Sequence, residues 1–138
     1  LNRPEKLNVL GWRTFEELVH LTDVLAEDRS ISVLVLTGAG EKAFCAGADI
    51  GMILSLAKDQ NFEEIRKACR TFQGMTCRLR YAPFPVVSAP FGMTLGGGCE
   101  VMLYSDLDIA HAELYTKSNE SGHSAATLDS GSAWRCRY

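Results

Sequence analysis

Positive charge, extended apolar segments and paired cysteines are all scarce in this 138-residue chain. Its net charge of −3 offers no basic surface for nucleic acid or anionic lipid, so we expect neither as a partner. The uncharged apolar stretches are far shorter than the roughly 20 residues that a membrane-spanning helix needs. We therefore expect no membrane segment.

Cysteine and histidine are too few and too scattered for a disulfide framework or a zinc site. The chain holds 5 Cys, an odd number, and no C-x-x-C pair. With only 3 His, few ligands remain for a metal cluster. We expect no bound metal, and reduced thiols in a reducing compartment. That compartment is expected to be the cytoplasm, or the mitochondrial matrix in a eukaryote.

Two segments carry the apolar period of amphipathic helices. Apolar residues recur at three- and four-residue steps over 15–25 and over 62–79. Capping-box patterns place the N-caps of these helices at Thr14 and Asn61, with a glutamate three residues later in each case. Both helices are expected to bury one face.

Extended and helical segments alternate along the rest of the chain. Residues 31–36 are almost wholly apolar, which predicts a strand covered on both faces. Further strands are expected at 85–89 and 106–111, with helices near 50–58 and 100–104. This alternation predicts an α/β fold.

The final residues differ in composition from the rest. Residues 116–138 include five serines and one aliphatic residue larger than alanine, Leu128. We expect one domain over 1–115 and a polar, loose tail over 116–138. Because the chain starts at Leu1 rather than at Met, we also expect a fragment or a processed product.

A glycine pattern, G-x-G-x-x-A, runs from Gly38 to Ala43. In a dinucleotide site this turn opens directly into a helix whose N–H groups hold a pyrophosphate. Here Phe44 and Gly47 follow too closely for an uninterrupted helix. A tight turn is the simpler interpretation.

Two further motifs of small residues each have a catalytic and a structural interpretation. In 44–50, the Ala48 amide could donate to an oxygen that becomes negative during a reaction, or the loop could simply pack, with Asp49 capping a helix. In 92–100, glycines at a helix start leave N–H groups for an anion, and Glu100 could act as acid or base. The alternative is a packing turn with a surface glutamate.

Taken together, these motifs resemble the N-terminal half of the crotonase (enoyl-CoA hydratase/isomerase) superfamily. The matching segments are 1–8, 33–49, 85–89, 95–100 and 105–110. The stretch 81–115 especially resembles the hydratase part of enzymes that also carry a 3-hydroxyacyl-CoA dehydrogenase domain. The resemblance implies a crotonase-like spiral of ββα units, incomplete because the C-terminal half is absent, and relatives that assemble as homotrimers or hexamers.

The resemblance also implies an activity, the hydration of 2-enoyl-CoA to 3-hydroxyacyl-CoA. The oxyanion hole falls on the backbone amides of Ala48 and Gly97, and the two glutamates that hold water fall on Glu100 and Glu120. Around Glu120, however, the sequence departs from the family's Gly-x-Pro-Glu approach. No cofactor is implied, because the CoA thioester is itself the substrate.

Substrate-binding positions carry over from the same motifs. The acyl-CoA channel would be lined by Ala48, Asp49 and Ile50, and the adenine end would lie near Lys6 and Leu7. Two alternatives stay open: an enoyl-CoA isomerase on the same scaffold, and a truncated, non-catalytic remnant that binds CoA.

Overall fold

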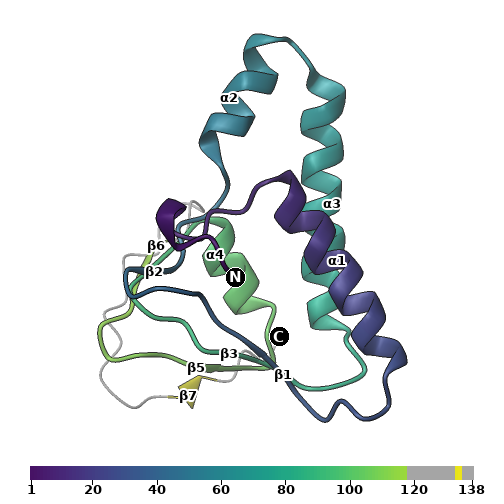
Figure 1. The fold of residues 1–138 in the computed structure, drawn as a ribbon, viewed down its shortest axis with the longest axis vertical. Helices are drawn as coiled ribbons and strands as arrows, with labels where there is room; N and C mark the ends of the chain where they lie inside the picture. The colour runs from purple at the N-terminus through teal and green to yellow at the C-terminus, as the bar shows by residue number, and fades with distance from the viewer. Residues whose placement is uncertain (118–132, 135–138) are drawn as a thin grey trace.

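Two small sheets and a set of helices make up the fold in this computed structural model, which describes residues 1–117 and 133–134 (Figure 1). The helices are η1 (Pro4–Lys6, a 3-10 turn), α1 (Trp12–Glu27), α2 (Ile50–Lys58), α3 (Phe62–Arg80) and α4 (Gly97–Leu103). The strands are β1 (Leu34–Leu36), β2 (Ala43–Cys45), β3 (Val86–Ser88), β4 (Met93–Leu95), β5 (Leu107–Ile109), β6 (Tyr115–Lys117) and β7 (Ala133–Trp134).

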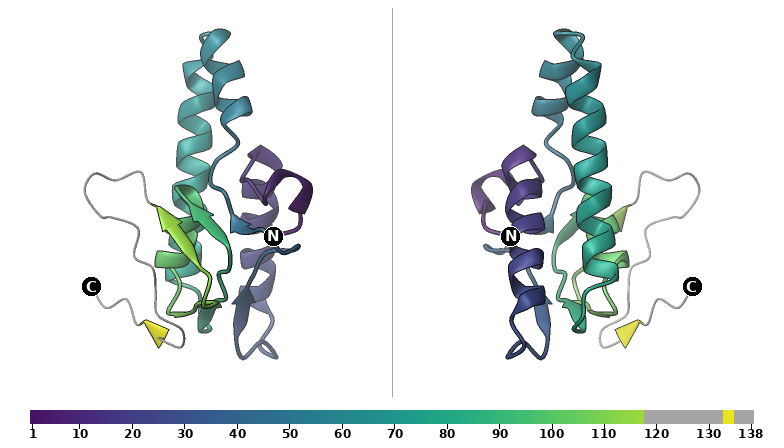
Figure 2. Two further views of the ribbon diagram at one scale, coloured as in Figure 1. Left: turned by 90° about the vertical axis from the view of Figure 1, so that its left-hand side faces the viewer. Right: turned by 90° about the vertical axis from the view of Figure 1, so that its right-hand side faces the viewer.

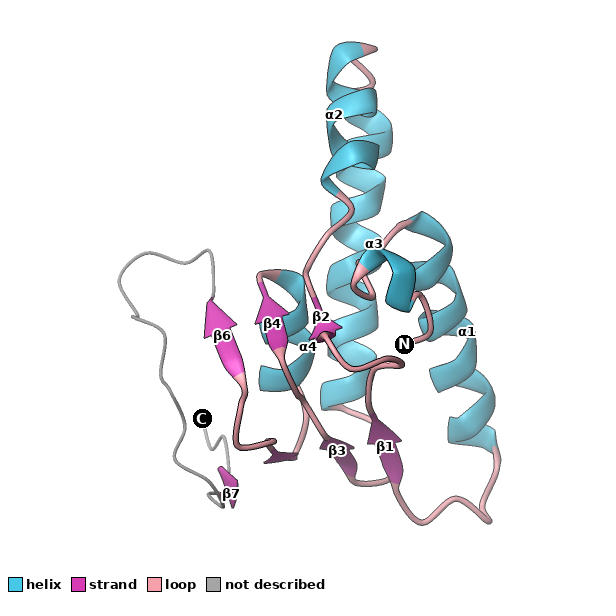
Figure 3. Cartoon of the chain, turned by 60° about the vertical axis from the view of Figure 1, so that its left-hand side comes forward, coloured by secondary structure: helices cyan, strands magenta, loops and turns pink. Residues whose placement is uncertain are grey.

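The chain forms a spiral, because each pass adds one strand to each sheet. One sheet has the order β1-β3-β5-β7 and the other the order β2-β4-β6 (Figure 3). All neighbouring strands are parallel except β5 and β7. Helices connect successive passes, as parallel pairing requires. The predicted α/β fold and its ββα spiral are confirmed.

The two long helices form where the apolar period predicts them, although one begins earlier. The Asn61 side chain accepts a hydrogen bond from the Glu64 N–H at 3.3 Å, which confirms the predicted cap of α3. The predicted cap at Thr14 is wrong, because α1 begins at Trp12 without a side-chain cap. The earlier start places the Trp12 ring under the Lys67 ammonium, 4.5 Å from the ring centroid.

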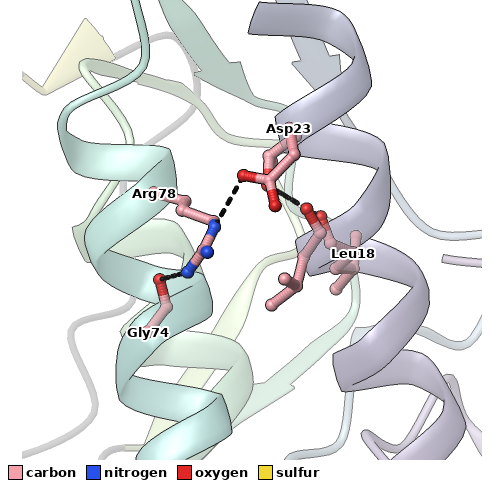
Figure 4. Close-up of polar contacts among 6 residues, drawn as sticks. Leu18, Asp23, Gly74 and Arg78 are labelled. Carbon is pink, nitrogen blue, oxygen red and sulfur yellow. Dashed lines mark hydrogen bonds and ion pairs between the residues drawn. The ribbon is translucent and has the colours of Figure 1, made fainter.

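Helices α1 and α3 lie side by side and enclose much of the core (Figure 2). The rings of Phe15 and Phe72 meet with centroids 5.4 Å apart. Near the other end of the interface, Arg78 forms an ion pair with Asp23 at 2.8 Å and donates to the Gly74 carbonyl (Figure 4). Because that pair is largely exposed, the aromatic contact contributes more to stability.

Strand β1 corrects the expectation of a strand buried on both faces. Leu36 is buried, whereas the Val35 side chain is 58% exposed. Alternate residues of a strand point to opposite faces, and no described element covers the Val35 face. A continuous apolar run in the sequence therefore did not distinguish a strand buried on one face from a strand buried on both faces.

Three strands were not predicted, and one of them is β7, which pairs with β5 from within the expected loose tail. Strand β4 lies inside the glycine-rich segment 92–98, where we expected only a turn; the Met93 N–H donates to the Lys42 carbonyl oxygen at 3.0 Å. Strand β6 pairs with β4 and crosses residue 115, the expected end of the domain. The division into 1–115 and 116–138 stays a prediction, because most of the second part lies outside the described residues.

Membrane-spanning helices and disulfides can be checked in the described residues. None of the helices in the described part of the chain combines the length and apolarity needed to cross a membrane. No disulfide joins the four cysteines of that part, which are Cys45, Cys69, Cys77 and Cys99.

A buried carboxyl lies between two strands of the first sheet. Asp108 on β5 accepts a short hydrogen bond from the Ser88 hydroxyl on β3, and both residues are almost fully buried. Burial raises the pKa of Asp108 from its ordinary 3.8 to about 6, against the opposing effect of the Ser88 hydrogen bond. The protonated carboxyl is thus favoured in the folded state.

This shift predicts stability that declines as pH rises. Because the folded-state pKa is the higher one, the contribution of Asp108 is fully present below about pH 4 and is lost as pH rises through about 6. In Asp108→Asn, which cannot ionise, the urea midpoint should fall less between pH 4 and pH 7.5 than in the unmodified chain. The same fall in both proteins would contradict the assignment.

Candidate functional site

Strands β2 and β4 are parallel neighbours, and each leads into one of the two loops of small residues. Cys45 on β2 lies opposite Thr94 on β4. The carboxyl ends of parallel strands meet at the same edge of a sheet, so the segments that follow them leave the sheet together (Figure 3). This pairing joins loop 46–49 to loop 96–97.

Two glycines allow these loops to touch. Gly47 has a φ of +92°, and a Cβ atom on it would lie 2.8 Å from the Leu95 carbonyl oxygen and 3.5 Å from the Gly97 nitrogen. A Cβ atom on Gly98 would overlap the Cys45 carbonyl oxygen and lie 2.8 Å from the Cys45 Cβ. The absence of side chains therefore sets how closely the loops approach each other.

The Ala48 N–H is directed by its neighbours. Leu10 N–H donates to the Gly47 carbonyl oxygen at 2.8 Å, and Asp49 N–H donates to the Leu10 carbonyl oxygen at 3.0 Å. In a trans peptide the C=O and the following N–H point in opposite directions, so the Ala48 N–H points away from Leu10. Within residues 1–117 and 133–134 this N–H has no hydrogen-bond acceptor.

The Gly97 N–H is the second donor. Gly97 is the first residue of α4, so its N–H has no acceptor inside the helix, and no other described residue accepts from it. An added Cβ would meet the Phe72 ring at 3.4 Å and Leu10 Cδ1 at 3.5 Å. Apolar groups therefore back this donor, and hydrogen bonds made there are strengthened by the low dielectric.

Glu100 lies in the first turn of α4, three residues after Gly97, and is half-buried. Residues three apart on a helix share a face, so the glutamate lies on the Gly97 side of α4. A carboxyl group on the same helix face as an N–H donor is suited to proton transfer next to a polarised carbonyl. The second predicted glutamate, Glu120, lies outside the described residues.

The predicted substrate-binding positions surround the first loop. Asp49 caps α2, accepting from the Met52 N–H at 3.3 Å, and Ile50 is 61% exposed at the start of that helix. The Ala46 N–H donates to the Leu7 carbonyl oxygen at 3.0 Å. Leu7 and the adjoining, exposed Lys6 thus sit beside the donor loop, while their roles toward a substrate stay predictions.

Asn8 is a structural residue of the site that sequence reasoning missed. Its buried amide donates to the carbonyl oxygens of Ala39 at 2.9 Å and Ala43 at 2.8 Å, and its Oδ1 accepts from the Arg3 N–H at 2.8 Å. This side chain joins the N-terminal segment to the glycine turn and to β2. A lone polar residue in an N-terminal loop gave no sequence signal for this role.

The segment from Gly38 to Ala43 is a turn. It runs into β2 rather than into a helix, so the N-terminal helix amides that a dinucleotide site needs are missing there. Among the described residues, no group of three or more His, Cys, Asp or Glu side chains is placed to hold a metal ion.

A protein-family model described as enoyl-CoA hydratase/isomerase matches residues 1–120. The chain belongs to the enoyl-CoA hydratase/isomerase family. Its N-terminal-half resemblance to the crotonase superfamily is thereby confirmed, over the part that holds both donor loops and Glu100.

Named members of the family show how much of a whole protein this chain represents. The short-chain-enoyl-CoA hydratase of Clostridium acetobutylicum is 39% identical over 110 residues, covering 80% of this chain and 41% of that protein. A probable 3-hydroxyacyl-CoA dehydrogenase of Bacillus subtilis is 43% identical over 95 residues, 69% of this chain and 12% of that protein. The chain therefore spans about two fifths of the length of the hydratase that it matches.

A solved structure of the family has the same fold. The crystal structure of an enoyl-CoA hydratase from Bacillus anthracis matches with a TM-score of 0.77 and 36% identity, covering 84% of this chain and 44% of that one. The described spiral is thus the first part of the crotonase fold.

The close packing of α4 on β2 predicts that alanine is destabilising at Gly98 but not at Gly74. Gly98→Ala should lower the free energy of unfolding by at least about 2 kcal/mol, because its Cβ overlaps backbone of β2. Gly74→Ala, in the middle of α3, meets only the flexible end of Arg78 at 3.4 Å and should be neutral or stabilise by up to about 1 kcal/mol. Urea unfolding compares the two variants, and equal stabilities would show that Gly98 of α4 is not packed against Cys45 of β2.

Proposed function

We propose that this chain binds the CoA thioester of a 2-enoyl acid and takes part in its hydration to a 3-hydroxyacyl-CoA. The observation that supports the proposal is the pair of open N–H donors, on Ala48 and Gly97, at the adjoining ends of β2 and β4. Family membership and hydratase relatives support the reaction class. A single thioester oxygen would accept from both donors.

The chemistry follows from polarising that oxygen. Two hydrogen bonds draw electrons from the conjugated double bond toward the oxygen, and they strengthen as the enolate-like transition state develops. The oxygen of water bonds to C3, and a proton goes to C2. Glu100 is proposed to hold this water and transfer the proton, with Glu120 as the partner that the resemblance supplies.

No cofactor enters the proposed reaction. Addition of water to a double bond transfers no electrons between reactants, so it needs neither a nicotinamide nor a redox metal. The two backbone donors take the place of a Lewis acid at the carbonyl oxygen. The CoA thioester is proposed as substrate only.

Assembly and compartment are part of the proposal. A homotrimer or hexamer is proposed for full-length relatives, in line with the resemblance. A cytoplasmic or, in eukaryotes, a mitochondrial setting agrees with relatives from bacteria and with a mouse relative named as mitochondrial.

A second candidate function is binding without turnover. It is favoured by one observation, that the sequence around Glu120 departs from the family's Gly-x-Pro-Glu approach. Isomerisation of the double bond on the same scaffold is the other alternative, and Glu100 alone fits it less directly. Crotonyl-CoA and a 3-enoyl-CoA together separate the three functions: with crotonyl-CoA, loss of the 2-enoyl absorbance reports hydration and calorimetry reports binding. Binding without loss of absorbance would support the remnant, and conversion of a 3-enoyl-CoA would support the isomerase.

Glu100→Gln tests the acid/base role. The amide keeps the size of the side chain but cannot take up or deliver the proton, so hydration should fall by at least about 100-fold. The dissociation constant for crotonyl-CoA should stay within about threefold, because the backbone donors are unchanged. Glu113→Gln, an exposed glutamate beyond β5, serves as the control. Turnover that survives Glu100→Gln would remove Glu100 from the mechanism.

A further inference from the structure

The thiol of Cys45 lies directly beneath the first donor loop. Cys45 ends β2 and is completely buried. Its Sγ accepts a hydrogen bond from the Gly47 N–H at 3.4 Å, across a single intervening residue. The sulfur is therefore a local acceptor for the loop that carries the Ala48 donor.

Each of the two peptide groups that flank Gly47 is held by its own hydrogen bond. The peptide before Gly47 is held through its N–H by the Cys45 sulfur, and the peptide after it through its C=O by the Leu10 N–H at 2.8 Å. Gly47 itself, with φ at +92°, has little intrinsic preference for this conformation. External contacts must therefore fix the plane of the peptide that contains the Ala48 N–H.

Cys45 also contacts the segment that carries the second donor. Gly98 packs against the Cys45 carbonyl and Cβ so closely that no side chain fits between them. Gly97, the second donor, directly precedes this contact. One residue, Cys45, thus touches the segment that carries each donor.

The Cys45 thiol is uncharged, as an acceptor next to a developing negative charge should be. Burial raises the pKa of Cys45 to about 11, so the thiol is neutral at physiological pH. A neutral sulfur accepts the Gly47 N–H without placing a negative charge beside an oxygen that becomes negative in the reaction.

We propose that Cys45 is a positioning residue of the thioester site, whose sulfur fixes the loop that presents the Ala48 N–H. The effect of Cys45 on thioester binding rests on the proposed function. The hydrogen bond from the Gly47 N–H to the sulfur does not. The hydrogen bond and the effect on thioester binding are therefore tested by separate measurements.

Cys45→Ala and Cys45→Ser isolate the acceptor, since both are small and only serine can receive the Gly47 N–H. By hydrogen exchange, the Gly47 amide should exchange at least about fivefold faster in Cys45→Ala, relative to the Leu18 amide of α1. In Cys45→Ser it should stay within about twofold of the unmodified chain. Thr94→Val is the control for a change of a buried side chain next to Cys45. Thr94 pairs with Cys45 on the neighbouring strand, and its buried hydroxyl has no partner in the described residues.

A third variant keeps the test valid if alanine lowers global stability. Cys45→Val fills the buried volume but offers no acceptor, so it should show the same fast Gly47 exchange. Equal Gly47 exchange in the serine variant and in the variants without an acceptor would overturn the proposal.

The second measurement is the affinity for crotonyl-CoA. Cys45→Ala should weaken it at least about fivefold and Cys45→Ser by less than about twofold, in step with the Gly47 exchange. If the affinity is unchanged in Cys45→Ala, the positioning role is wrong. If the unmodified chain binds no thioester while Gly47 exchange responds as predicted, the proposed function fails and the contact of Cys45 with the loop stands.

Discussion

The parallel pairing of β2 with β4 is the contact on which the site depends. It aligns two strand ends that are far apart in the chain, and the donor loops leave the sheet at those ends. Glycine at positions 47 and 98 then removes the side chains that would separate the loops. Without that pairing, the small-residue motifs would be two unrelated turns, and the proposed binding of one oxygen by both N–H groups would be impossible.

Much of the fold could be predicted because local patterns and tertiary packing agree. The apolar period of 62–79 marks α3 well, since that helix has a true side-chain cap at Asn61 and buries Met75 and Leu79. The burial is not continuous along the predicted stripe, because Phe62 and Cys69 are exposed. Start signals were less reliable: α1 begins at Trp12, whose ring lies under the Lys67 ammonium of α3, and a capping pattern at Thr14 does not reveal that contact. Tertiary contact thus overrides a local signal at the ends of elements.

Features that depend on long-range contacts were beyond the sequence patterns. Strand β4 was hidden among glycines, and the burial of β1 on one face only depends on what covers the sheet. The site was located through a resemblance, which gave positions for the proposed donors but no reason for their orientation. The backbone hydrogen bonds of Leu10 to Gly47 and Asp49 orient the Ala48 N–H, and a short sequence pattern does not encode such contacts.

The convergence of the Ala48 and Gly97 N–H groups on one oxygen is tested most directly by vibrational spectroscopy. Crotonyl-CoA labelled with ¹³C at the thioester carbonyl would be bound to the chain, and its C=O stretch compared with that in water. Two hydrogen bonds from a site backed by apolar groups predict a shift to lower frequency. A bound thioester that keeps the solution frequency, or a chain that binds no thioester, would contradict the convergence of the two donors on a substrate oxygen.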